Sequence, residues 1–431
     1  MEQKIPIFGA SSRLPCTNRS IDFAAAIQAS TRSINQATAM KLNSILILPG
    51  IFMIAIMGIF PAAAQPVKVE YREETELVAV VARLAGVSGY TWEEEETGVY
   101  DYFIDVDSTF APFRNHKLIP FVREKLYGEG FNWHFPMHIA MRISIGEDGK
   151  ITYDNSLEKG FDGYYDRITR RNEKKFLRLL EDFNRESGFH EFFLSHKALY
   201  SECEAAMREV VGKIDFSWYK DFFGKDEGST FRICPGLLCG PGNYAVHQRG
   251  RDGSDIVNAI MGCCDRREDG SICYGIEYTL PIIIHEFCHS FCDPLNQEYW
   301  DSIKEAAESF FSENAEFYDS IAYGHPILVM NETFVEACVI TYLKSHPLLF
   351  EGETLEGYRE YFGMGEASAE EVFRKYLELL VDIDYTKKKF LMIKDVIGVL
   401  EDRENNPEKY PAVADLMSEY SRVVNSFGKQ E

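Results

Sequence analysis

Residues 281–292 read PIIIHEFCHSFC and carry two histidines, His285 and His289, inside an otherwise apolar run. Four residues turn an α-helix by about 400°, so the two imidazoles would project from one face, a turn apart. Glu286 is the charged residue of the stretch. A buried helix does not accept two histidines and a glutamate unless something pairs with them, and a metal ion would do so.

The order of these residues is H-E-x-x-H, the arrangement of zinc peptidases. Glu286 lies about 100° round the helix from His285, beside an ion held by the histidines rather than on it. A carboxylate there can take a proton from metal-activated water. Chance occurrence of the pattern is the competing interpretation, and the uncharged flanks argue against it.

A second apolar segment offers a third ligand. Residues 325–346 read HPILVMNETFVEACVITYLKSH, with helical periodicity, and place Glu332 and Glu336 on one face. A solvated helix edge is the alternative, but the neighbouring residues leave little polar face. The glycine and third histidine of the metzincin class are missing after the first motif, which excludes that class. If neither glutamate binds the ion, Asp293 or Asp301 is the next candidate.

The pair HEFCH … NETFVEA resembles the gluzincin peptidases, the thermolysin and aminopeptidase type, in which an N-E-containing helix follows the H-E-x-x-H helix. The resemblance implies that Zn²⁺ is bound by His285, His289 and Glu332, and that Glu336 hydrogen-bonds a ligand histidine. The interval from His289 to Glu332 is longer than in the best-known members. More widely, IIIHEFCHSFCDPL, GNYAV…DIVNAIMG and NETFVEACVITYL resemble an uncharacterised family of secreted bacterial H-E-x-x-H proteins, which brings no known substrate.

Peptide hydrolysis is the activity that this ligand set implies. Two histidines and one carboxylate leave one zinc position for water, whose proton Glu286 would accept and pass to the leaving amine. Tyr323 and His325 precede the second helix and could donate to the oxyanion, although residues at such a junction more often cap or pack. An extended peptide could lie along a sheet edge formed by DIVNAIMG or by GNYAV.

Two other functions stay open at this point. The protein could be a zinc hydrolase of non-protein amides, or a non-catalytic zinc-binding envelope protein. The intact Glu286 argues against the second, because a structural zinc site has no use for a general base.

The N-terminal segment carries an export pattern. From Met40 the chain reads MKLNSILILPGIFMIAIMGIFPAAAQ, with a lysine, an apolar run and small residues before Gln65. This pattern predicts a signal peptide and cleavage of residues 1–64, although the run is long enough for a membrane anchor. We expect a secreted or periplasmic protein without stable membrane association.

Charge and cysteine content bound the partners and the redox state. Lys and Arg number 45 against 68 Asp and Glu, a formal charge of −23, which disfavours nucleic acid as a partner. The resemblance to zinc peptidases implies a peptide or protein substrate instead. After export, we expect at least one disulfide in a loop-rich cluster of cysteines, with reduced, half-buried thiols as the alternative. The cluster consists of Cys234, Cys239, Cys263, Cys264 and Cys273.

These patterns together predict an α+β, zincin-like fold with a small mixed sheet, an active-site helix and a largely helical C-terminal lobe. Residues 65–276 would form the lobe with the sheet and 277–431 the helical zinc-binding lobe, the two making one catalytic unit. Pro281 is expected in the first turn of the active-site helix, and Asp293–Pro294 at its end. Strands are predicted at 66–71 and 255–262, and later helices at 301–317, 326–345, 367–382, 387–402 and 410–425.

Overall fold

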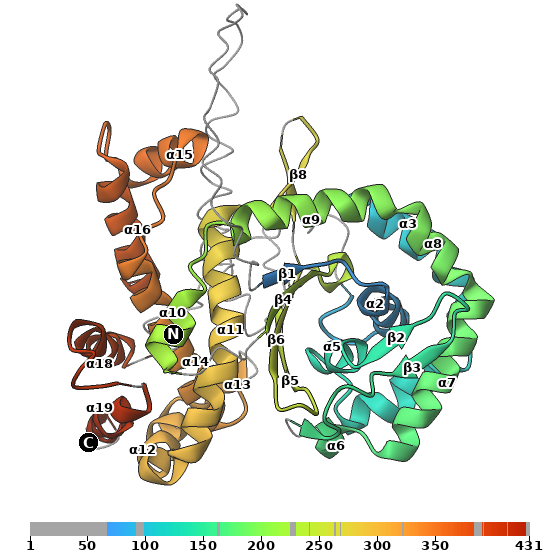
Figure 1. Ribbon diagram of the computed structural model, residues 1–431, viewed down its shortest axis with the longest axis horizontal. Coiled ribbons are helices and arrows are strands. Elements are labelled where there is room, and N and C mark those ends of the chain that lie inside the picture. Colours follow the sequence, from blue (N-terminus) through green and yellow to red (C-terminus); the bar gives the residue numbers. More distant parts are fainter. Residues whose placement is uncertain are drawn as a thin grey trace, which may run out of the picture.

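The computed structural model describes residues 67–91, 99–161, 164–224, 230–240, 242–262, 264–267, 269–320, 323–382, 390, 392–411 and 413–427. The signal peptide expected within residues 1–64 lies outside them. The described residues form an α+β protein that is mostly helical, with small sheets, as predicted (Figure 1).

The main sheet has four strands in the order β1-β4-β6-β5. Strands β1, β4 and β6 run parallel, and β5 pairs antiparallel with β6. The predicted strands at 66–71 and 255–262 are therefore present. Of the two predicted edge segments, DIVNAIMG forms an interior strand, so that prediction is wrong, whereas GNYAV contributes to edge strand β5. The four strands are β1 (Val67–Val69), β4 (Thr230–Pro235), β5 (Tyr244–Arg249) and β6 (Asp255–Met261).

Helices cover both faces of this sheet (Figure 1). Helices α2 (Glu73–Ala85) and α5 (Phe135–Ala140) lie on one face, and α11 (Ile276–Glu298) lies against the other. Because it is covered on both sides, β6 is buried from its second residue onward and is apolar there except for Asn258, whereas β5 alternates as an edge strand should. The hydrophobic core is continuous across the sheet.

The N-terminal half adds further helices and the short hairpin β2–β3, and a two-stranded sheet, β7–β8, precedes α11. Their bounds are α3 (Tyr100–Phe110), α4 (Leu118–Phe121), β2 (Ile143–Ile145), β3 (Ile151–Tyr153), α6 (Tyr164–Arg167), α7 (Arg170–Ser187), α8 (Phe189–Ser195), α9 (Lys197–Val211), α10 (Ser217–Phe223), β7 (Asp265–Arg266) and β8 (Ile272–Cys273).

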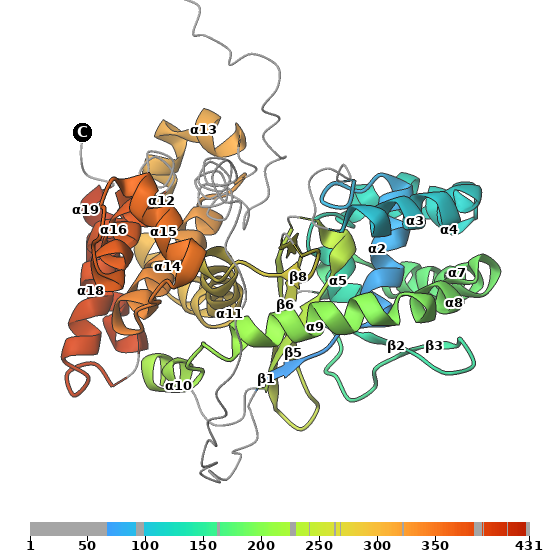
Figure 2. The same cartoon turned by 90° about the horizontal axis from the view of Figure 1, so that it is seen from above.

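The chain after α11 is helical and gathers on the side of the sheet away from α2 (Figure 2). The predicted helix at 326–345 matches α14 residue for residue, while α15 was not predicted. The bounds are α12 (Trp300–Glu313), α13 (Ala315–Ser320), α14 (Pro326–Ser345), α15 (Gly352–Phe362), α16 (Ala369–Asp382), α18 (Ile393–Asn405) and α19 (Met417–Phe427).

Helix α11 is longer at both ends than predicted. It begins at Ile276, so Pro281 lies inside it, and it continues past Pro294 to Glu298. Proline at 281 has no N–H to donate to the carbonyl of Glu277, which would leave that group unpaired. The hydroxyl of Tyr376 in α16 donates to this carbonyl at 2.5 Å. Tertiary contact thus satisfies what the proline removes, and the helix extends beyond its sequence signals.

Helix α14 is the most apolar long helix among the described residues. Its length and apolar composition would suit a membrane span, but most of it is buried inside the protein. It packs against α11, α12 and α18. Within the described residues, it is therefore a core helix, and the two carboxylates it carries are buried with it.

Candidate metal centre

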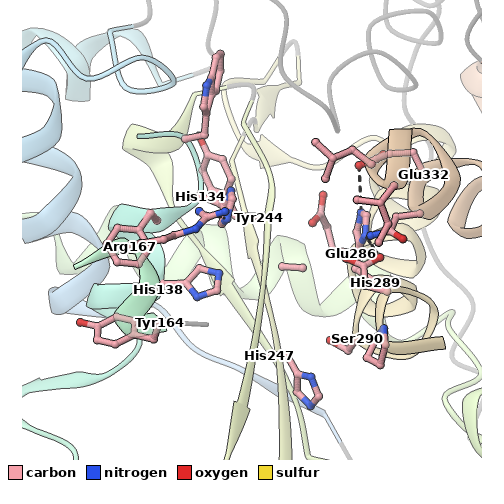
Figure 3. Close-up of a pocket in the computed structure, with 18 of the residues that line it drawn as sticks. His134, His138, Tyr164, Arg167, Tyr244, His247, Glu286, His289, Ser290 and Glu332 are labelled. Carbon is pink, nitrogen blue, oxygen red and sulfur yellow. Dashed lines mark hydrogen bonds and ion pairs between the residues drawn. The ribbon is translucent and has the colours of Figure 1, made fainter. Parts of the chain in front are cut away.

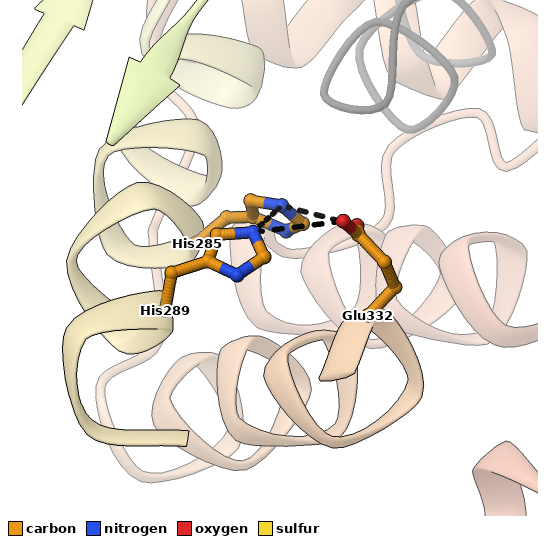
Figure 4. Close-up of side chains that lie close together, drawn as sticks. All are labelled: His285, His289 and Glu332. Atoms are coloured by element: carbon orange, nitrogen blue, oxygen red, sulfur yellow. Dashed lines mark hydrogen bonds and ion pairs between the residues drawn. The ribbon is translucent and has the colours of Figure 1, made fainter. Parts of the chain in front are cut away.

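Three side chains from α11 and α14 converge on one point (Figure 4). The Nε2 atoms of His285 and His289 are 3.1 Å apart. The carboxylate of Glu332 faces both, at 3.6 Å from the Nε2 of His285 and 3.8 Å from that of His289. His285 and Glu332 are 2% and 3% exposed, and His289 is partly buried.

The arrangement fits a metal ion. Zn²⁺ binds histidine nitrogen at about 2.0–2.1 Å, so two nitrogens of one tetrahedral site lie about 3.3 Å apart. The three ligand atoms all lie within 4.8 Å of one another. Two imidazole nitrogens that face each other and a carboxylate at this depth require a shared partner, and a cation supplies it.

A carboxylate backs the outer nitrogen of each histidine. Glu336, one turn after Glu332, lies 3.3 Å from Nδ1 of His285. Asp293, one turn after His289, lies 3.1 Å from Nδ1 of that ring. Such carboxylates fix the ring orientation and direct Nε2 toward the ion. Glu336 is where the resemblance implied, whereas Asp293, considered above as a ligand, contacts the outer side of a histidine instead.

The same carboxylates set the charge around the imidazoles. Burial alone lowers the pKa of His285, but the carboxylates of Glu336 and Glu332 outweigh it, so the pKa is raised. For His289 burial is likewise outweighed by Asp293 and Glu332, which raise its pKa to about 10. The cluster therefore attracts positive charge, which a proton or a metal ion can supply.

Glu286 lies on the same helix, 3% exposed, and lines a pocket of about 930 Å³. His289, Glu332 and Asp293 also line it, so the metal cluster faces the pocket directly. Two further polar residues of this wall, Ser290 and Asn331, are at most 8% exposed.

The opposite wall comes from the N-terminal half and from β5 (Figure 3). It carries His134, His138 and Arg167, together with the strand residues Tyr244 and His247. The sequence analysis identified the strand segment but missed the other residues. They lie outside any motif, and only the packing of α5 against β5 and of α6 against α5 brings them to the pocket.

Tyr323 and His325 are not among the residues that line the pocket. The ring of His325 accepts a hydrogen bond from the backbone N–H of Ile327 and caps α14. It also packs on Trp300. Tyr323 is fully buried in the core. The structure therefore places the expected oxyanion donors elsewhere, in the capping and packing positions that such junction residues commonly take.

The expected disulfide is absent among the described cysteines. Cys234, Cys239, Cys264 and Cys273 form no disulfide, and the first three are buried, while Cys263 lies outside the described residues. Burial raises the pKa of the Cys234 thiol to about 12, and the pKa of Cys273 is also raised. These thiols pack as small apolar side chains, which was the alternative interpretation.

Comparison with known families gives one match, over residues 67–352, to a model described as a domain of unknown function (DUF4932). The matched region contains the whole sheet, α11 and α14, and hence all the residues of the metal cluster. Comparisons with curated proteins and with solved structures give no match. Because the match covers well over half of the sequence, the chain belongs to the DUF4932 family.

Proposed function

We propose that the protein is an exported zinc peptidase of the gluzincin type with a zincin-like fold. One observation carries the proposal: His285, His289 and Glu332 converge on one point, and Glu286 lies beside them on the wall of a 930 Å³ pocket. A purely structural zinc site is closed, with all its positions filled by protein ligands. Here the described cluster has three ligands and faces a pocket.

The chemistry assigned to each side chain follows from its place. Zinc, when bound, supplies a Lewis acid that polarises the scissile carbonyl. Glu286 is not a member of the ligand group and faces the same pocket, so its carboxylate can take a proton from water and deliver it to the leaving amine. Glu336 and Asp293 hold the histidine rings in place.

The shape of the pocket supports a peptide as substrate. Its volume is near the upper end of the range for small-molecule sites, about 300–1,000 Å³, which leaves room for several residues. Edge strand β5 forms part of the wall, and an extended peptide can pair with the edge of a sheet. Export rests on the signal-peptide pattern that begins at Met40.

The test uses protein that begins at Gln65. Metal analysis should find one zinc per chain in the wild type and in Glu286→Gln. Digestion of a broad peptide library should show cleavage by the wild type and none by Glu286→Gln, because that variant keeps the ligands and loses the base. Glu298→Gln, an exposed carboxylate at the end of α11, is the matched control and should cleave as the wild type does.

Two results would refute the proposal. Absence of bound metal in the wild type would remove the centre itself. Equal cleavage by the wild type and Glu286→Gln would show that the activity does not come from this site.

A further inference from the structure

The pocket is electrically asymmetric. Its lining carboxylates all come from the metal side, on α11 and α14: Glu286, Asp293 and Glu332. Among the described lining residues, Arg167 is the single lysine or arginine, and it lies on the wall across from them (Figure 3). A substrate that spans the pocket therefore meets negative groups at one side and a guanidinium at the other.

Two contacts orient the side chain of Arg167, although it is exposed at the end of α6. Its Nη1 atom lies 2.6 Å from Nε2 of His134. Because arginine can only donate, this ring nitrogen accepts, and its proton is on Nδ1. The guanidinium also lies over the ring of Phe135, 5.7 Å from its centre.

Of the two neighbouring basic residues, Arg142 adds positive charge behind this wall and His138 adds none. Arg142 is 1% exposed behind this wall, and it donates from Nη1 to the carbonyl of His138 at 3.2 Å. Burial, with the adjacent His134, Arg142 and Arg167, holds the pKa of His138 well below its ordinary value. His138 therefore stays neutral, and Arg167 carries the positive charge of the pocket surface.

Trp133, which precedes His134 on this wall, has a strained backbone conformation. Its φ is +46°, and among the described residues no other non-glycine residue has a positive φ. The hydroxyl of Tyr90 donates to the carbonyl of Trp133 at 2.9 Å. Gly89 leaves room for the indole, since a Cβ there would lie 3.3 Å from its ring. A strained backbone persists only where the surrounding structure holds it, and such residues cluster at ligand-binding and active sites.

We propose that Arg167, oriented by His134 and flanked by Trp133, binds a carboxylate of the peptide substrate. The proposal deepens the function proposed above and rests on it. A guanidinium recognises a carboxylate through two parallel hydrogen bonds, which a neutral amide cannot reproduce. The overall charge of −23 repels acidic peptides, so a fixed cation is needed where one is to be accepted. The carboxylate can be the C-terminus of the peptide or an acidic side chain.

The experiment measures binding apart from hydrolysis. Fluorescent peptides are titrated into zinc-loaded Glu286→Gln protein by anisotropy. One pair differs in a C-terminal carboxylate or amide, and a second pair, blocked at the C-terminus, differs in an internal Glu or Gln. One pair should show about tenfold tighter binding of the acid, and the pair that does so identifies the source of the carboxylate. When the wild-type protein cleaves the same peptides, the KM values of the neutral and acidic peptides should differ by the same ratio, and kcat should be nearly unchanged.

Variants connect that preference to the proposed residue. Adding Arg167→Gln should abolish the preference and leave binding of the amide and Gln peptides unchanged, while Arg167→Lys should retain part of it. Arg171→Gln, an exposed arginine outside the pocket lining, has the same charge change and should keep the full preference.

The outcomes separate this proposal from the proposed activity. Equal binding of acid and neutral peptides, or a preference that survives Arg167→Gln, overturns the carboxylate site. If the preference depends on Arg167 but the wild-type protein cleaves no peptide, the carboxylate site is supported and the peptidase activity is refuted. If peptides are cleaved without a preference for the acid, the peptidase activity is supported and the carboxylate site is refuted. Peptides that neither bind nor react refute both.

Discussion

The Nδ1 atom of His289 lies 3.1 Å from the Oδ1 atom of Asp293, one helical turn further along α11. The contact exists because α11 continues through Asp293 and Pro294 instead of ending there. With Glu336 behind His285, each histidine has its own carboxylate, one from its own helix and one from α14. The metal cluster is thus supported from both helices.

Removing Asp293 should weaken the metal without abolishing the site. Asp293→Ala and Glu336→Ala should each lower zinc affinity by about 10–100-fold, whereas Glu332→Ala should weaken binding far more. Competition with a chelator of known affinity measures all three, and Glu298→Ala on the same helix is the control. If Asp293→Ala loses zinc as completely as His289→Ala, Asp293 is a ligand rather than a support.

Tyr376 should matter for stability because residue 281 is a proline. Tyr376→Phe leaves the buried Glu277 carbonyl without a donor and should lower the free energy of unfolding by about 1–3 kcal/mol. In a Pro281→Ala background the N–H of residue 281 can pair with that carbonyl, so the same change should cost less. Urea unfolding of the four proteins gives the coupling free energy. An equal cost in both backgrounds would contradict this account of the helix.

Glu76 should make the protein less stable as the pH rises. Burial raises the pKa of this carboxyl from 4.5 to about 7, even though the hydroxyl of Tyr102 donates a hydrogen bond to it. Between these values the unfolded chain loses the proton while the folded chain keeps it. The free energy of unfolding therefore falls from about pH 4.5 to pH 7, by about 3 kcal/mol for this group, and then levels off.

The pH effect is tested by comparing Glu76→Gln with the wild type at pH 5 and pH 8. Glutamine does not titrate, so the variant should lack this part of the fall in the free energy of unfolding. Glu191→Gln, an exposed residue of α8, should follow the wild type. If the free energy of unfolding changes equally with pH in Glu76→Gln and the wild type, Glu76 has the same pKa in the folded and unfolded states, which would contradict the prediction.

The described cysteines should be reduced. Non-reducing mass mapping should find no bridge among them, and reductant should leave the melting temperature unchanged. Cys292 of α11 and Cys338 of α14 give the most sensitive test of this prediction, because their sulfur atoms are 3.8 Å apart. A bridge there would cross-link the two metal helices and show that the chain meets an oxidising compartment.

The sequence predicted the parts that depend on local signals. Helix α14 was placed correctly because Pro326 follows a capping residue and apolar periodicity runs unbroken. The grouping of His285, His289 and Glu332 followed from helical spacing and a resemblance. The N-terminal end of α11 could not be predicted, because the hydroxyl of Tyr376, 99 residues beyond Glu277, pairs with the carbonyl that Pro281 leaves without a donor. Likewise, Trp133, His134 and Arg167 reach the pocket through long-range packing that no local pattern records.

The apolar character of α14 has a consequence for biosynthesis. If the chain is exported as proposed, this segment must pass through a translocation channel unfolded, and it is long and apolar enough to be held in the lipid. Glu332 and Glu336 are its seventh and eleventh residues, near the middle. An acidic side chain at the centre of a span opposes insertion by about 2.5–3.5 kcal/mol. The carboxylates that build the metal cluster would therefore also let the segment reach the compartment where it folds.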